Sequence, residues 1–162
     1  MKPQDIEAAR AVAFRFLGQS ARSRAEIVRR LERDSFAPEI VDATVAELEA
    51  KGYLDDSQFA QAWISDRADR KSYGRARLAA ELNRKGVDRQ TIRETLDGVD
   101  DADELARALQ AARSKWKPEL LGSTDHSTEL SAKRRIIAFL QRRGFSWSII
   151  EQVLAKLMQN KS

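Results

Sequence analysis

Apolar positions recur every three or four residues along most of the chain, which is the spacing of amphipathic helices. The clearest pattern occurs three times, in residues 26–41, 77–92 and 135–150. The copies align when their central leucines are placed in register, at Leu31, Leu82 and Leu140. In each copy an aliphatic residue stands four positions before the leucine, and another apolar residue stands five positions after it. Each copy therefore predicts a helix, a tight turn and a second helix.

The turn in each copy carries its own signals. Gly86 and Gly144 follow the first helix, where a residue in the left-handed conformation commonly ends a helix. Asp88 and Ser146 stand at the N-cap of the next helix, and Pro38 occupies the first helical position of the first copy. The apolar residue before each cap is expected to pack on the new helix as a hydrophobic staple. These signals favour a tight, fixed turn in all three copies.

A further amphipathic helix precedes each pair, so each unit is expected to contain three helices. Acidic pairs mark where the second and third units begin, at Asp55-Asp56 and Asp100-Asp101. No stretch has the alternating pattern of a strand. We predict an all-α fold, an elongated tandem array of three three-helix repeats with helix-turn-helix-like units. The predicted boundaries are 1–54, 55–99 and 100–162.

One segment, residues 117–131, interrupts this pattern. It contains Pro118, Gly122 and a run rich in serine and threonine, which are typical of loops. We predict an exposed, mobile loop inserted into the third repeat.

Composition and charge restrict the chemistry. The 162 residues include no cysteine, which excludes disulfides and thiolate metal sites and favours a reducing, cytoplasmic location. The N-terminus is charged and no apolar run reaches membrane-spanning length, so we expect neither a signal peptide nor a membrane partner. A net charge of +4 favours acidic partners such as nucleic acid or an acidic protein surface.

Residues with catalytic potential have simpler structural interpretations. The one histidine, His126, falls in the predicted loop, where a solvated side chain is the expected state. Ser23 and Glu26 have the spacing of a capping box, and the acidic pairs have the position of helix caps. No glycine-rich phosphate loop can be written. We therefore expect no catalytic residue, metal site or cofactor.

Basic residues form two clusters. Nine lysines and arginines but only three acids lie between positions 67 and 93, and no acid lies between positions 132 and 150. The candidate partner-binding residues are Arg70, Arg75, Arg77, Arg84, Arg134, Arg135, Arg142 and Arg143. Arg77 and Arg84 are predicted to form an outward stripe. The alternative is that these cations only solvate outer faces and complement helix dipoles.

Helix-turn-helix units also suggest DNA reading by the last helix of a unit. The predicted final helix of the first unit, residues 38–51, is rich in glutamate and aspartate, which a phosphate backbone would repel. Sequence-specific readout is therefore disfavoured, whereas non-specific phosphate contact through the middle unit stays open.

Four motifs, in order along almost the whole chain, resemble the RecX family of recombination regulators. They are SRAE (23–26), GYLDD (52–56), YGRARLAAELNRKGV (73–87) and KRRIIAFLQRRGFSWSII (133–150). The chain departs from the family pattern at Asp34-Ser35, where a basic residue and glycine are usual, and in the 117–131 segment.

The resemblance implies a non-catalytic regulator whose partner is the filament of RecA, the recombinase that polymerises on single-stranded DNA. Family members are thought to lie along the helical groove of the filament and to inhibit ATP hydrolysis, strand exchange and co-protease activity. The resemblance is compatible with a monomer that needs no cofactor. The basic faces could also contact single- or double-stranded DNA. The alternatives are a non-specific DNA-binding helical module and a hydrolase or nuclease.

Overall fold

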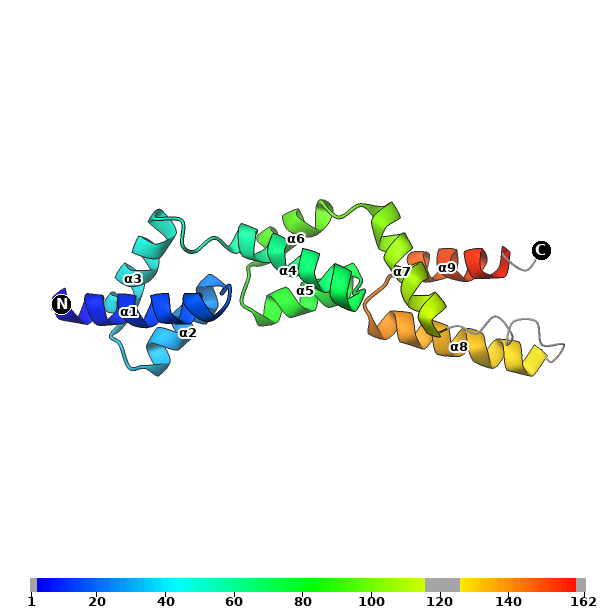
Figure 1. Ribbon diagram of the computed structural model, residues 1–162, viewed down its shortest axis with the longest axis horizontal. Coiled ribbons are helices and arrows are strands. Elements are labelled where there is room, and N and C mark those ends of the chain that lie inside the picture. The colour runs from blue at the N-terminus through cyan, green and yellow to red at the C-terminus, as the bar shows by residue number, and fades with distance from the viewer. Residues whose placement is uncertain (1–2, 116–125, 160–162) are drawn as a thin grey trace. The chain divides into compact units, whose positions relative to one another are not determined.

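The structure is a computed structural model that describes residues 3–115 and 126–159. Within these ranges the chain forms nine helices and no strand (Figure 1). The helices are α1 (Pro3–Gln19), α2 (Arg24–Arg33), α3 (Pro38–Ala50), α4 (Asp56–Lys71), α5 (Arg75–Arg84), α6 (Arg89–Asp97), α7 (Asp101–Lys115), α8 (His126–Arg142) and α9 (Trp147–Gln159). The predicted all-α class is confirmed.

The chain divides into two compact units. The first unit comprises residues 1–63 and 82–95, and the second comprises residues 64–81 and 96–162. Because α4 and α5 each contribute residues to both units, the repeat boundaries at 54/55 and 99/100 stay a prediction.

Each unit has an apolar core, which is formed by the apolar stripes predicted for its helices. The first core includes Ile27, Leu31 and Leu48, and the second includes Leu140, Ile150 and Val153, all at most 1% exposed. Burial of such aliphatic side chains is the main favourable contribution to folding.

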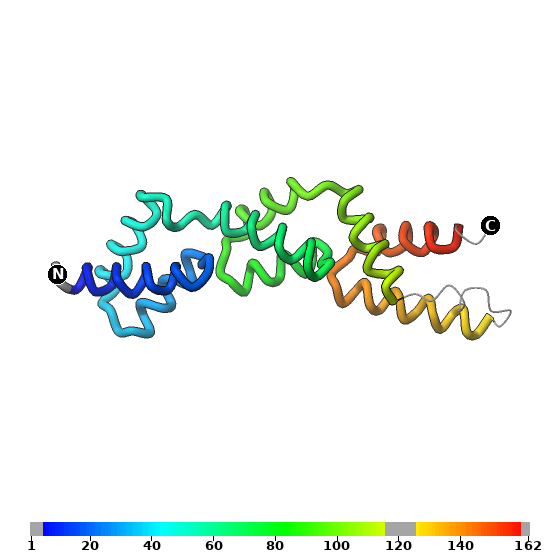
Figure 2. Tube along the Cα trace, in the orientation of Figure 1, coloured from blue at the N-terminus to red at the C-terminus, as the bar shows by residue number. Residues whose placement is uncertain are grey.

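The tight turn between the second and third helices of each repeat can be followed in Figure 2. One residue in each turn has a positive φ, at Ser35 (63°), Gly86 (79°) and Gly144 (82°). In each turn the following amide donates a hydrogen bond to the carbonyl of the central leucine, in the pairs Phe36 to Leu31, Val87 to Leu82 and Phe145 to Leu140. This is the Schellman arrangement. The first turn adopts it although Ser35 replaces the glycine.

The predicted helix caps are also present. The Ser23 side chain accepts a hydrogen bond from the Glu26 amide, and the Glu26 carboxylate accepts one from the Ser23 amide. Asp55 and Asp88 accept bonds from amides three residues later, and Asp100 accepts one from the Ala102 amide. These contacts give the serine and the carboxylates structural roles.

Part of the predicted loop is helical. Helix α8 begins at His126, so residues 126–131 are helical, whereas residues 116–125 lie outside the described ranges. Glu129 forms an ion pair with Lys133 one turn later, at 2.9 Å, and Ala132 continues the buried stripe of Ile136 and Leu140. This pairing and burial favour a helix over the loop that serine and threonine suggested.

Candidate partner interface

The turn between α5 and α6 docks on the N-terminus of α2, within the first unit. The Ser23 hydroxyl donates to the Lys85 carbonyl, and Lys85 Nζ lies 2.8 Å from Glu26 Oε1. Burial raises the pKa of Glu26, but hydrogen bonds from Lys85 and Ser23, with the charges of Lys85 and Arg22, outweigh it and leave this pKa below its ordinary value. Part of the basic character of this region is therefore neutralised within the chain.

The turn between α8 and α9 docks in a similar way on the N-terminus of α5, within the second unit. The Gly74 amide donates to the Arg143 carbonyl at 2.7 Å, and the Ala76 amide donates to the Gly144 carbonyl at 3.2 Å. Amides at a helix start have no partner within the helix, so these carbonyls complete the start of α5. A Cβ atom at Gly74 would lie 2.4 Å from the Gly144 oxygen. Close backbone approach thus explains both glycines.

Arg75 is engaged within the second unit. Its guanidinium lies 2.6 Å from Asp101 and 2.9 Å from Glu104, and it donates to the Val99 carbonyl. The hydrogen bond that the Arg75 guanidinium donates to Asp101 is the main reason that the pKa of Arg75 is raised. Glu104 is only 2% exposed, and its carboxylate also accepts the Arg75 amide at 3.1 Å. This candidate contact residue therefore has a clear structural role.

Arg77 is also less free than the predicted outward stripe implies. Its guanidinium lies 4.7 Å from the Tyr73 ring centroid and donates to the Arg142 carbonyl at 3.3 Å. The side chain is 40% exposed, because the turn before α9 packs beside it. Arg84, on the same helix, is exposed.

The remaining candidates lie mostly at the surface. Arg70 is 78% exposed and pairs with Asp66 at 2.9 Å. Arg134, Arg135 and Arg142 are exposed, and within the described residues their side chains make no ion pair. Arg143 is half-buried, with its guanidinium 4.8 Å from the Phe139 ring centroid.

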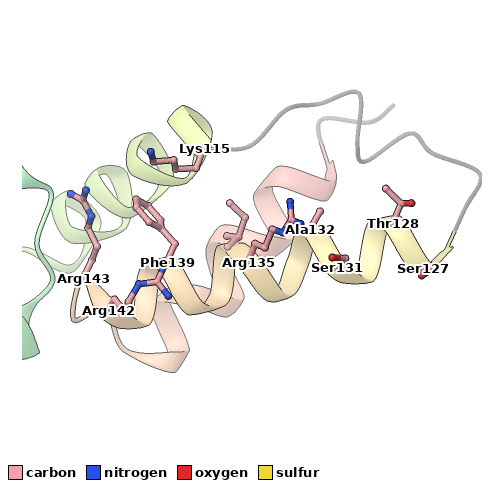
Figure 3. Close-up of a pocket in the computed structure, with 10 residues that line it drawn as sticks. Lys115, Ser127, Thr128, Ser131, Ala132, Arg135, Phe139, Arg142 and Arg143 are labelled. Carbon is pink, nitrogen blue, oxygen red and sulfur yellow. The ribbon is translucent and has the colours of Figure 1, made fainter.

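Three of these arginines line a cleft of about 820 Å³, which we call the α7–α8 cleft. Its described lining residues are Lys115, Ser127, Thr128, Ser131, Ala132, Arg135, Ile136, Phe139, Arg142 and Arg143. Figure 3 shows Phe139 and Arg143 side by side near the C-terminal end of α8, with Lys115 extending from the last turn of α7. The described lining contains four cations and no carboxylate. An anionic group is the ligand that such a lining favours.

A second cleft, of about 410 Å³, lies in the first unit, and we call it the α2–α5 cleft. Its lining residues are Phe16, Glu26, Arg29, Arg30, Arg33, Arg84 and Lys85. Arg84 was a candidate from the sequence, but the three arginines of α2 were not. Arg29 and Arg33 lie one helical turn apart, which indicates a shared basic face on α2. The acidic residues of the next helix, α3, drew attention away from that face.

The described residues provide no group of three or more histidine, cysteine, aspartate or glutamate side chains that could hold a metal. No helix in the described ranges combines the length and apolar character needed to cross a bilayer. His126 is exposed at the first residue of α8. The geometry is thus that of basic surfaces on a helical scaffold.

Known proteins share the three-repeat organisation that the sequence predicts. The first, second and third three-helix domains of RecX match residues 9–48, 55–96 and 102–154. Regulatory protein RecX of Mycobacterium avium (strain 104) is 38% identical over 157 residues, which cover 96% of this chain and 88% of that protein. The chain belongs to the RecX family. The resemblance of the four sequence motifs is thereby confirmed.

Other RecX proteins extend this relationship. Regulatory protein RecX of Thermobifida fusca (strain YX) is 36% identical over 145 residues, covering 89% of this RecX-family chain and 76% of that protein. The crystal structure of RecX from Lactobacillus salivarius aligns with a TM-score of 0.85 at 18% identity, covering 96% of this chain and 98% of that chain. At that identity the likeness shows a shared fold.

Proposed function

We propose that this protein is a non-catalytic regulator of RecA. It binds the RecA–DNA filament along the helical groove and inhibits ATP hydrolysis, strand exchange and co-protease activity. The observation that carries the proposal is the match of three consecutive RecX domains to nearly the whole chain, whose relatives are named regulatory proteins. The protein acts as a monomer in the cytoplasm and needs no cofactor.

The basic clefts supply the contacts in this mechanism. Exposed arginines attract acidic surfaces or bound DNA, which speeds association and makes binding sensitive to salt. Arg84 acts from the α2–α5 cleft, and Arg135 and Arg142 act from the α7–α8 cleft. Arg70 and Arg134 add exposed charge, whereas Arg75, Arg77 and Arg143 also hold the scaffold together.

The test is RecA ATP hydrolysis on single-stranded DNA, titrated with this protein at low and moderate salt. Binding of the protein to the same DNA without RecA is measured in parallel. Inhibition at protein concentrations that leave free DNA largely unoccupied supports direct action on the filament. If hydrolysis falls only as the protein coats the DNA, the filament mechanism is wrong.

A charge variant locates the contact. Arg33→Gln combined with Arg84→Gln removes two cations from the α2–α5 cleft, and Arg15→Gln combined with Arg24→Gln removes two exposed cations outside its lining. We expect only the first pair to weaken inhibition. Equal effects of the two pairs would show that net charge, and not this cleft, matters.

The alternative function is a non-specific DNA-binding helical module, which the same cationic clefts favour. Such a module would keep its DNA affinity without RecA and lose it steeply with salt, since each phosphate contact releases a counterion. The DNA-only titration separates the two proposals.

A further inference from the structure

The α7–α8 cleft has an uneven lining that points to a particular kind of ligand. The apolar side chains that line it, Ala132, Ile136 and Phe139, form an apolar floor. The cations Lys115, Arg135, Arg142 and Arg143 surround this floor. The volume of about 820 Å³ lies within the range of roughly 300–1,000 Å³ that is common for ligand pockets.

We propose that the α7–α8 cleft binds an acidic peptide segment that carries one apolar anchor side chain. The anchor occupies the floor, where burial removes apolar surface from water. The neighbouring aspartates or glutamates pair with the surrounding cations, and arginine can hold a carboxylate through two parallel hydrogen bonds. The inference names the kind of segment that a protein partner presents, and in that respect it rests on the proposed function.

Charge complementarity is the first argument for this occupant. The described lining includes no carboxylate, and the side chains of Arg135 and Arg142 make no ion pair with any described residue. Arg134 is equally exposed on the same helix but does not line the cleft. Arg135 and Arg142 therefore keep their charge available to a ligand.

The contact between Arg143 and the Phe139 ring favours a peptide ligand over a nucleic acid. Single-stranded nucleic acids bind by stacking bases on open aromatic faces along a basic groove. In this cleft the Arg143 guanidinium lies 4.8 Å from the Phe139 ring centroid, and the same arginine donates to the Lys71 carbonyl. The Arg143 guanidinium thus occupies ring surface on which a base would stack.

The experiment measures fluorescence anisotropy of a short fluorescein-labelled peptide of aspartate and glutamate with one central leucine. The full-length protein is titrated into this peptide, into the same peptide with serine in place of leucine, and into labelled oligothymidine. We expect the leucine peptide to bind most tightly. Tighter binding of oligothymidine, or equal binding of the serine peptide, would overturn the proposal.

Two double variants locate the site. Arg135→Gln with Arg142→Gln should weaken binding of the leucine peptide about tenfold, since each partly solvated cation contributes about threefold. The matched control, Arg113→Gln with Arg134→Gln, removes the same charge from exposed positions outside the lining and should leave binding within about twofold. Arg135→Lys with Arg142→Lys should keep most of the affinity of the parent protein. Equal losses in both glutamine pairs would overturn the cleft assignment.

Inhibition of RecA ATP hydrolysis by the same proteins separates this inference from the proposed function. A parent protein that inhibits RecA but binds no acidic peptide refutes the peptide site and leaves the regulator intact. A parent protein that binds the peptide through Arg135 and Arg142 but does not affect RecA supports the site and refutes the proposed function.

Discussion

Replacement of Gly144 by alanine tests whether the docking of the α8–α9 turn on α5 stabilises the second unit. Two separate costs apply at this position. Its φ of 82° costs an alanine about 1–2 kcal/mol. A Cβ atom would also lie 2.3 Å from the Arg77 nitrogen, and overpacking of this kind typically costs about 1–3 kcal/mol. The sum is a loss of about 2–5 kcal/mol in the free energy of unfolding.

Two other glycines separate these costs. Gly52 has a φ of 76° with no atom within 4 Å of an added Cβ, so Gly52→Ala should cost only about 1–2 kcal/mol. Gly74 has no positive φ, but its added Cβ would lie 2.4 Å from the Gly144 oxygen, so Gly74→Ala should cost about 1–3 kcal/mol. Gly144→Ala is thus expected to be the most damaging of the three.

Urea unfolding followed by circular dichroism gives the three free energies, and amide hydrogen exchange gives the location. Gly144→Ala should speed exchange at the amides of Gly74 and Ala76, which lose their partners Arg143 and Gly144. Gly52→Ala should leave exchange at both amides unchanged. If Gly144→Ala costs no more than Gly52→Ala and preserves protection at Gly74, the docked turn does not stabilise the unit.

Three further predictions concern individual side chains. Ser35→Gly should stabilise the protein by about 1 kcal/mol, because glycine tolerates the φ of 63°, and a lower melting temperature would contradict this. Glu104→Gln should cost about 1–3 kcal/mol in urea unfolding by removing a charged partner of Arg75, whereas Asp103→Asn should change little. The pKa of Glu26 is lowered in the folded protein, so its contribution to stability is complete above the ordinary value of 4.5 and is lost as pH falls through the lowered pKa. Glu26→Gln should therefore be less stable than the parent at neutral pH and lose less stability on acidification, and parallel curves for the two proteins would refute this.

Local signals made the three turns predictable from the sequence. Each turn depends on residues within a few positions of a leucine, so aligned copies at Leu31, Leu82 and Leu140 carry the necessary information. The extent of α8 was harder to predict, because serine and threonine near residues 127–131 are common in loops. The ion pair between Glu129 and Lys133 and the burial of Ala132 override that local preference.

The candidate site was less predictable because charge alone does not show how a cation is used. Arg75 and Arg84 look alike in the sequence, yet only Arg75 lies beside the buried Glu104. That neighbour comes from a distant part of the chain, and periodicity says nothing about it. The α2–α5 cleft could not be predicted for the same reason, because it combines cations from α2 with Arg84 and Lys85, which are distant in the sequence.

The α5–α6 and α8–α9 turns each stabilise a unit and also contribute a residue to a cationic cleft. In the first unit the Lys85 carbonyl accepts the Ser23 hydroxyl, and in the second unit the Arg143 carbonyl accepts the Gly74 amide. Both bonds use backbone atoms of basic residues, so the side chains form separate contacts, Lys85 with Glu26 and Arg143 with the Phe139 ring. Lys85 and Arg143 accordingly also line the two cationic clefts. A turn that docks by its backbone can therefore stabilise the scaffold while its basic side chain lines a cleft, although Glu26 partly neutralises the charge at Lys85.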